Sequence, residues 1–365
     1  MNQKMKTHSI ADDARVDPTV LAELAKTGSH VAAPEASPES YATMDQKLSI
    51  LAATEPMLKA NLNNCVLNLN LPTLTNVSCT KVVVLGVDSN EVVLYIHKPT
   101  DHLINGRGAP LPCVYHIHGG GMCLLEASDE YYVRWRSEIA SLGVMVVGVE
   151  YRNAAGVRGC HRYPAGLNDC ISGLKYLHSN KAALGISTIV LNGESGGGNL
   201  ALATCLYAKK LDILSHISGV YAQCPFISNL YQLGAQVTEL PSLQECNGYL
   251  LDGVFMNMMA EVYTPLAGAT RCTDPLAWPY HAPADALTGL PPHTITVNEL
   301  DPLKDEGVSY YRKLMKAGVR ANCKVIMATT HAAEMAAARR GMSEVHRSAV
   351  YDVYQFARNI TDAVL

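Results

Sequence analysis

The sequence has no long apolar run and no cluster of basic residues. No stretch approaches the roughly 18 apolar residues that a membrane-spanning helix requires, so no membrane span is expected. Lysine and arginine never form a run longer than two residues, and the formal net charge is -4 with a pI near 6.3. This pattern lacks the basic surface that binds the phosphate backbone, so nucleic acid is not an expected partner.

The eleven cysteines are scattered, odd in number and never arranged as a Cys-x-x-Cys pair. Several fall inside expected strands or helices, where a thiol packs as a small apolar group. The N-terminus has Lys4 and Lys6 followed by Asp12, Asp13 and Arg15 instead of an apolar core, so no secretory signal is expected. These observations favour a reducing cytoplasm.

The length and apolar content of the chain are sufficient for a large core. With 365 residues, of which 48% are hydrophobic, it can hold one α/β domain of about 250 to 300 residues and an added cap. From residue 81 onward, β-prone runs alternate with helical ones, which predicts a mainly parallel sheet with helices on both faces. The expected strands are 81–87, 91–97, 112–118, 144–151, 188–193, 219–225, 293–299 and 323–329.

The segments between these runs complete the expected layout. The turn Asp88-Ser89-Asn90 predicts that the first two strands form an antiparallel hairpin. Residues 1–45 contain few large apolar side chains, which favours a mobile start with one or two short helices. Longer helices are expected at 165–184, 199–210, 306–317 and 343–357.

A Gly-x-Ser-x-Gly string at 193–197 lies between an expected strand and an expected helix. This string is typical of a nucleophile elbow, a turn so tight that side chains at the flanking positions would collide. An apolar run at 187–192 precedes it and the helix at 199–210 follows it, as an elbow requires. Ser195 is therefore the expected nucleophile.

A second glycine-rich string, His118-Gly119-Gly120-Gly121, follows the strand-like run 111–117. Such a string is a source of backbone N–H donors for an oxyanion hole, because glycines let the main chain approach the substrate oxygen with no Cβ in the way. Either string alone can be an ordinary turn. Their occurrence together, in this order and each after a strand, favours a hydrolase site.

With these motifs the chain resembles the hormone-sensitive-lipase-like group of the α/β-hydrolase superfamily, the bacterial family IV type of carboxylesterase. The resemblance runs from about residue 81 to the C-terminus and includes Tyr151-Arg152, the string 193–199 and the string 301–307. It implies an α/β-hydrolase fold, in which a mainly parallel eight-stranded sheet is flanked by helices and covered by a helical cap.

The resemblance also implies how the chain is divided. In this family an N-terminal segment and an insertion after the sixth strand form the cap. Residues 1–60, the first 15 of them expected to be mobile, and residues 227–280 are therefore assigned to the cap. Residues 61–226 and 281–365 are assigned to the catalytic domain.

A serine hydroxyl needs a histidine to accept its proton and a carboxylate to orient that histidine. In an α/β hydrolase the order along the chain is Ser, then Asp or Glu, then His, with the last two on loops after late strands. His331 directly follows the run 323–330 and is the expected base. His346 lies within the expected helix at 343–357 and is the weaker candidate.

The expected acid is Asp301. It ends the strand-like run 293–300 and precedes Pro302, which makes the chain turn. Asp305 is the alternative, although it and Glu306 have the placement of acidic residues in the first turn of the next helix. The resemblance also points to Asp301, because the first aspartate of this string is the catalytic one in the family.

The resemblance assigns the oxyanion hole to the backbone N–H groups of Gly120, Gly121 and Gly196. His118, together with Gly119, is expected to shape this loop by hydrogen bonding. His116 and His118 share one face of a strand, but no third ligand stands at a spacing typical of metal sites. Neither a metal nor a cofactor is expected.

The predicted activity is hydrolysis of short to medium acyl esters, with a small-molecule ester as substrate and an acyl-enzyme intermediate. Acyl transfer by the same three residues is an alternative. A second alternative is a ligand receptor, since plant gibberellin receptors resemble this family but lack the triad histidine, whereas this chain has His331. A homodimer is expected only by analogy with the family.

Overall fold

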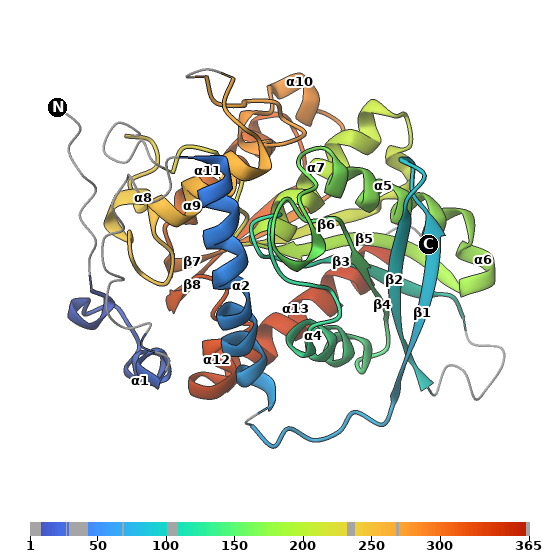
Figure 1. Ribbon diagram of the computed structural model, residues 1–365. Coiled ribbons are helices and arrows are strands. Elements are labelled where there is room, and N and C mark those ends of the chain that lie inside the picture. The colour runs from blue at the N-terminus through green and yellow to red at the C-terminus, as the bar shows by residue number, and fades with distance from the viewer. Residues whose placement is uncertain are drawn as a thin grey trace.

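An eight-stranded sheet forms the centre of the computed structural model, which describes residues 9–26, 28, 43–67, 69–100, 109–231, 238–267 and 270–362 (Figure 1). Its strands are β1 (Val77–Leu85), β2 (Glu91–Pro99), β3 (Leu111–Ile117), β4 (Met145–Glu150), β5 (Ile186–Glu194), β6 (Gly219–Gln223), β7 (His293–Leu300) and β8 (Ala321–Thr330). Their order across the sheet is β1-β2-β4-β3-β5-β6-β7-β8. All eight predicted strands are present, so the predicted fold class is confirmed.

The pairing of the strands brings their carboxyl ends together. The first two strands form the predicted antiparallel hairpin, β2 pairs antiparallel with β4, and the other neighbours are parallel. In the register of the central strands, Ile117 lies opposite Gly193 and Glu194 lies opposite Gln223. Loops that leave β3, β5 and β6 at this edge therefore start side by side, where open α/β sheets bind their ligands.

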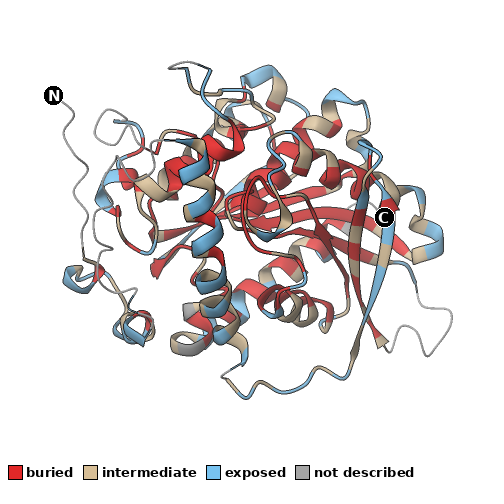
Figure 2. Cartoon of the chain, viewed as in Figure 1, coloured by how far each residue is buried: buried red, intermediate tan, exposed pale blue. Residues whose placement is uncertain are grey.

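Helices cover both faces of the sheet (Figure 1). On one face lie α4 (Glu130–Ala140) and α13 (Ser343–Asp362), and on the other α5 (Ala165–Ser179), α7 (Gly196–Lys210) and α11 (Lys304–Lys316). The helix predicted at 165–184 is interrupted at Asn180, after which α6 (Lys181–Leu184) begins. Nearly every residue of β3, β4 and β5 is buried between the layers, whereas β1 carries exposed residues (Figure 2).

The remaining helices are short or lie outside these layers. They are η1 (Ile10–Asp12), α1 (Pro18–Lys26), α2 (Met44–Leu67), η3 (Gly156–Arg158), η4 (Leu214–His216), α8 (Ser242–Glu245), α9 (Gly253–Tyr263), η6 (Pro279–His281), α10 (Ala284–Leu287) and α12 (Ala337–Gly341). Among them α2 packs against α4 and α9, and α1 packs against α12. No helix in the described ranges combines the length and the apolar character needed to cross a membrane.

The start of the described chain packs against distant parts of the fold. Residues 1–8 lie outside the described residues, but Ile10 is only 1% exposed and joins a small apolar cluster with Val20, Leu24, Tyr249 and Leu300. The mobility predicted for the first 15 residues stays a prediction. Val20 and Leu24 belong to the same N-terminal segment, whereas Tyr249 and Leu300 come from distant parts of the chain.

Candidate active site

Ser195 sits in a strained turn between β5 and α7. Its φ of 56° and ψ of -120° lie in a region that costs a non-glycine residue about 1 to 3 kcal/mol. A Cβ built on Gly197 would lie 2.0 Å from the carbonyl oxygen of Ile117, and one on Gly193 would lie 2.4 Å from that of Gly197. The backbone N–H of Ser195 donates to the Gln223 carbonyl over 2.9 Å. The two flanking glycines are therefore required by the elbow geometry that the sequence predicted.

Asp301 and His331, from the ends of β7 and β8, form a direct pair. The Nδ1 atom of His331 lies 2.7 Å from Oδ2 of Asp301, and the two residues are 8% and 0% exposed. Burial alone would lower the pKa of His331. The charge and hydrogen bond of Asp301, with smaller contributions from Glu334 and Glu194, outweigh burial and raise this pKa above its usual value.

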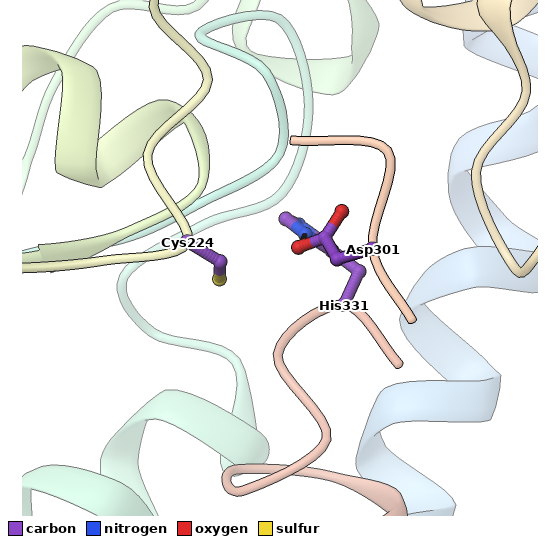
Figure 3. A group of neighbouring side chains, drawn as sticks. All are labelled: Cys224, Asp301 and His331. Carbon is purple, nitrogen blue, oxygen red and sulfur yellow. Dashed lines mark hydrogen bonds and ion pairs between the residues drawn. The ribbon is translucent and has the colours of Figure 1, made fainter. Parts of the chain in front are cut away.

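The side chain of Cys224, at the end of β6, lies beside this pair (Figure 3). One ligand atom from each of Cys224, Asp301 and His331 lies within 4.8 Å of the others. The backbone N–H of Cys224 donates to the Thr296 carbonyl over 2.7 Å. Burial, reinforced by nearby carboxylates, raises the pKa of the thiol well above its usual value, which keeps it protonated. Nothing in the sequence indicates a role for Cys224 except its place at the end of an expected strand.

The glycine loop after β3 contacts the start of α7. Gly120 and Gly121 have φ values of 91° and 62°, which glycine adopts without strain. A Cβ on Gly196 would lie 2.7 Å from the Gly121 nitrogen and 2.6 Å from the Met122 nitrogen. Main-chain N–H groups from both predicted sources of the oxyanion hole are therefore brought close together.

A set of buried polar side chains supports this loop. Oε1 of Glu194 accepts the Gly119 N–H over 2.5 Å, and its Oε2 lies 3.2 Å from Nε2 of His116. The ring of His118 stacks on Tyr151 with 4.2 Å between centroids, and its Nδ1 lies 3.0 Å from the Gly119 carbonyl oxygen. The Tyr151 hydroxyl donates to the carbonyl groups of His118 and Gly119.

A second buried network connects the loops that carry Ser195 and His331. Gln223, whose carbonyl accepts the Ser195 N–H, donates its side-chain amide to Glu334 over 3.2 Å. Asn298 donates to the other carboxylate oxygen of Glu334 over 2.9 Å. Burial raises the pKa of Glu334. Gln223, Asn298 and Glu334 carry no local sequence signal, because the residues that bond to one another are far apart in the chain.

The two alternative residues occupy other positions. The Nδ1 atom of His346 bonds to the Glu334 carbonyl over 2.7 Å, and its Nε2 lies 3.0 Å from a carboxylate oxygen of Glu138. Asp305 accepts the backbone N–H of Ser242 over 2.7 Å. Both side chains thus take part in contacts that hold the fold. The structure does not bring His346 and Asp305 together.

Glu306, at the start of α11, is a buried carboxyl group that interacts electrostatically with Asp301. It accepts hydrogen bonds from the Ile227 N–H over 2.6 Å, the Tyr231 hydroxyl over 3.2 Å and the Ser228 hydroxyl. Burial is the main reason why its pKa rises from 4.5 to about 8. The carboxyl group is therefore neutral in the folded protein near neutral pH.

This shift makes stability depend on pH. Above pH 4.5 the Glu306 carboxyl ionises in the unfolded chain, but in the folded protein it stays neutral up to about pH 8. It should therefore reduce the free energy of unfolding progressively over this window, by up to about 4 kcal/mol. Glu306→Gln removes this titration, so the variant should lose less stability than the wild type between pH 5 and pH 8. Urea unfolding at both pH values measures the difference, and parallel losses in the two proteins would contradict it. Glu91→Gln, at an exposed glutamate, is the control.

The chain is similar in sequence and in structure to known hydrolases. A sequence profile of the alpha/beta hydrolase fold matches residues 114–335. Among solved structures, brefeldin A esterase, a bacterial homologue of human hormone-sensitive lipase, is 36% identical with a TM-score of 0.89, and the match covers 97% of this chain and 96% of that one. The esterase Est22 is 34% identical with a TM-score of 0.82, covering 96% of this chain and 99% of that one.

Curated relatives have similar names. Carboxylesterase NlhH of Mycobacterium tuberculosis is 31% identical over 220 residues, which are 57% of this chain and 62% of that protein. An arylesterase of Saccharolobus solfataricus is 28% identical over 253 residues, 66% of this chain and 72% of that protein. The match to NlhH thus spans less than two thirds of its length.

Proposed function

Because this chain belongs to the α/β-hydrolase fold family, within its hormone-sensitive-lipase-like group, we propose that it is a carboxylesterase with Ser195 as nucleophile, His331 as base and Asp301 as the orienting acid. The observation that carries the proposal is the buried 2.7 Å contact between His331 and Asp301 at the same sheet edge as the strained Ser195. Esterases among the relatives support it.

The reaction follows from these three side chains. Nε2 of His331 accepts the Ser195 hydroxyl proton as the oxygen attacks the ester carbonyl. The negative charge then forms on the carbonyl oxygen, where the N–H groups of Gly120, Gly121 and Gly196 donate to it. His331 returns the proton to the departing alcohol, leaving an acyl ester on Ser195. A water molecule, deprotonated by His331, hydrolyses that ester in the same way.

The raised pKa of His331 suits this role. Asp301 accepts the Nδ1 proton, which leaves Nε2 as the proton acceptor and stabilises the imidazolium that forms during attack. Gly119 and His118 act indirectly, by holding the glycine loop in position. Gly119 donates its N–H to Glu194, and the ring of His118 stacks on Tyr151. The neutral thiol of Cys224 packs beside the pair and has no step of its own. The chemistry assigned to these residues uses no cofactor.

We assign the cap to residues 1–60 and 227–280, with α2 and α9 as its main helices. Support comes from Met259 in α9, whose sulfur would lie 2.5 Å from a Cβ on Gly121, and whose carbonyl accepts from the Cys123 thiol over 3.4 Å. The side chain of Met259 thus stands next to the proposed oxyanion hole. This crowding favours short to medium acyl chains.

A chain-length series of p-nitrophenyl esters tests the activity and the preference together. We expect kcat/KM to be highest for acetate to octanoate and to fall for palmitate, with one equivalent of a fluorophosphonate probe attached at Ser195. Mass spectrometry of the labelled peptide locates the probe. A protein that neither hydrolyses any ester nor reacts with the probe would contradict the proposal and favour a receptor. Ester products formed with added alcohols would favour acyl transfer.

Two further properties are part of this proposal. We propose a homodimer that uses the outer strand β8, where Val325 and Met327 are 45% and 61% exposed. Light scattering should then give twice the chain mass of 39.4 kDa, and a single chain mass would contradict it.

We also propose a cytoplasmic location, since all eleven cysteines are free thiols and six of them are buried.

A further inference from the structure

The loop that supplies the proposed oxyanion hole is strained at two residues that are not glycine. Met122 and Leu125 have φ values of 59° and 73°, in addition to the positive values at Gly120 and Gly121. This left-handed region is unfavourable for a residue with a side chain, because the Cβ comes too close to a carbonyl oxygen. Such a conformation persists only where surrounding contacts hold it. The contacts that hold this loop therefore control the position of its N–H groups.

One of these contacts comes from a carboxylate in α2. Oε1 of Glu55 accepts the N–H of the strained residue Leu125 over 2.7 Å, and Oε2 accepts the N–H of Val157 over 2.7 Å. Glu55 is 1% exposed, and a Cβ on Gly156 would lie only 2.4 Å from its Oε2. A buried carboxylate that receives two backbone donors makes short, strong hydrogen bonds with a fixed geometry.

The same face of α2 makes further contacts with the chain that follows the loop. Lys59, one helical turn after Glu55, pairs with Glu126 over 2.8 Å and with Asp129. Asn63, one turn further, accepts the Tyr131 N–H over 3.1 Å. Positions four residues apart lie on one side of a helix, so these three side chains form a single stripe along α2. The stripe begins at Glu55, the member that bonds to the strained residue Leu125.

The loop at 153–157 is the second support. Asn153 donates its side-chain amide to the Leu125 carbonyl over 2.7 Å, and the N–H of Ala154 donates to the Met122 carbonyl over 2.9 Å. Glu55 bonds to both loops, so it fixes their relative position. Its own position depends on α2, a helix whose sequence lies more than 50 residues before the glycine string.

We propose that Glu55 is a positioning residue of the oxyanion hole, which holds the strained glycine loop in place from the cap helix α2. The inference rests on the proposed esterase function. A donor that binds only the developing oxyanion acts in the transition state, so a displaced loop should lower kcat and leave KM nearly unchanged. The cap would thus support the chemistry as well as cover the site.

Glu55→Gln tests this role with little change in shape. The amide keeps one acceptor but sets its NH2 group against one of the two backbone donors. We expect kcat for p-nitrophenyl butyrate to fall about 10- to 100-fold, as for a misplacement of about 1 Å, with KM changed less than threefold. Affinity for a trifluoromethyl ketone, whose hemiketal oxygen also needs the hole, should fall by a similar factor. Asp45→Asn, at an exposed carboxylate of the same helix, should keep both values.

A second measurement tests the positioning role of Glu55 even if the protein does not hydrolyse esters. Hydrogen exchange followed by mass spectrometry should show faster exchange of the peptide covering 119–126 in the Glu55→Gln variant, while peptides from β5 and β6 keep wild-type rates. Exchange that is unchanged at 119–126, or faster throughout the protein, would overturn the positioning role. So would wild-type kcat and ketone affinity in the folded variant. An inactive wild-type protein with faster local exchange in the variant would instead refute only the esterase proposal.

Discussion

Replacing Ser195 with alanine is expected to lower kcat for ester hydrolysis by about 10⁶-fold, the cost of losing the nucleophile in a well-studied serine hydrolase. The methyl group cannot attack the carbonyl, and no other hydroxyl occupies the elbow between β5 and α7. The backbone strain of the turn is the same for serine and alanine, so stability should change little. Hydrolysis of p-nitrophenyl butyrate measures the loss.

The Ser195→Ala sample must be free of wild-type enzyme, because a trace of it would hide a 10⁶-fold loss of kcat. The variant should be produced in a host that has no copy of the wild-type gene, and its fold checked by circular dichroism. Ser187→Ala is the matched control, since Ser187 lies on the same strand β5, away from the elbow. If the Ser195 variant kept measurable turnover while Ser187→Ala lost it, the nucleophile would be assigned wrongly.

Asp301→Asn is expected to lower kcat about 10⁴-fold, as the corresponding change does in a serine protease. Asparagine can present its NH2 group to Nδ1 of His331, which favours the tautomer with the proton on the wrong nitrogen. The charge that raises the pKa of His331 is also lost. Because the base must be neutral, the acid side of the profile of kcat/KM against pH should move to lower pH in this variant.

Asp305→Asn separates the two candidate acids. Asp305 is in the same loop and helix turn but accepts the Ser242 N–H, so its replacement should change kcat less than about threefold. The pH profiles of both variants and the wild type are measured with one substrate. A large loss of kcat in the Asp305 variant, with wild-type kcat in the Asp301 variant, would reverse the assignment. If the acid limb of the profile of kcat/KM against pH were the same in the Asp301 variant and the wild type, the proposed effect of Asp301 on the pKa of His331 would be refuted.

Features with a local signal were predicted well. The hairpin turn Asp88-Ser89-Asn90, the alternation of strands and helices, and the tight turn around Ser195 each follow from neighbours in sequence, and the structure has all of them. Asp301 and His331 could be selected because each directly follows a strand and the order of the strands fixes the edge at which they emerge. Their 2.7 Å contact agrees with that choice.

The residues that support the site had no such signal. Glu55 binds Leu125 and Val157, which are 70 and 102 positions away, and the bond between Gln223 and Glu334 joins residues 111 positions apart. A glutamate in a helix is ordinarily a solvated residue, and nothing in its neighbours indicates that it will be covered. Such partners are defined only when the strands are ordered and the helices are packed, so they need the three-dimensional arrangement.

The apolar cluster around Ile10 affects how the protein can be shortened for crystallisation or fusion. Leu300, a member of that cluster, comes directly before Asp301, and the Asp17 N–H donates to the Ala328 carbonyl close to His331. A truncation that begins after Arg15 would remove Ile10 from the buried cluster that includes Leu300. A shortened version should therefore start at or before Ser9, and tags are better attached upstream of that residue.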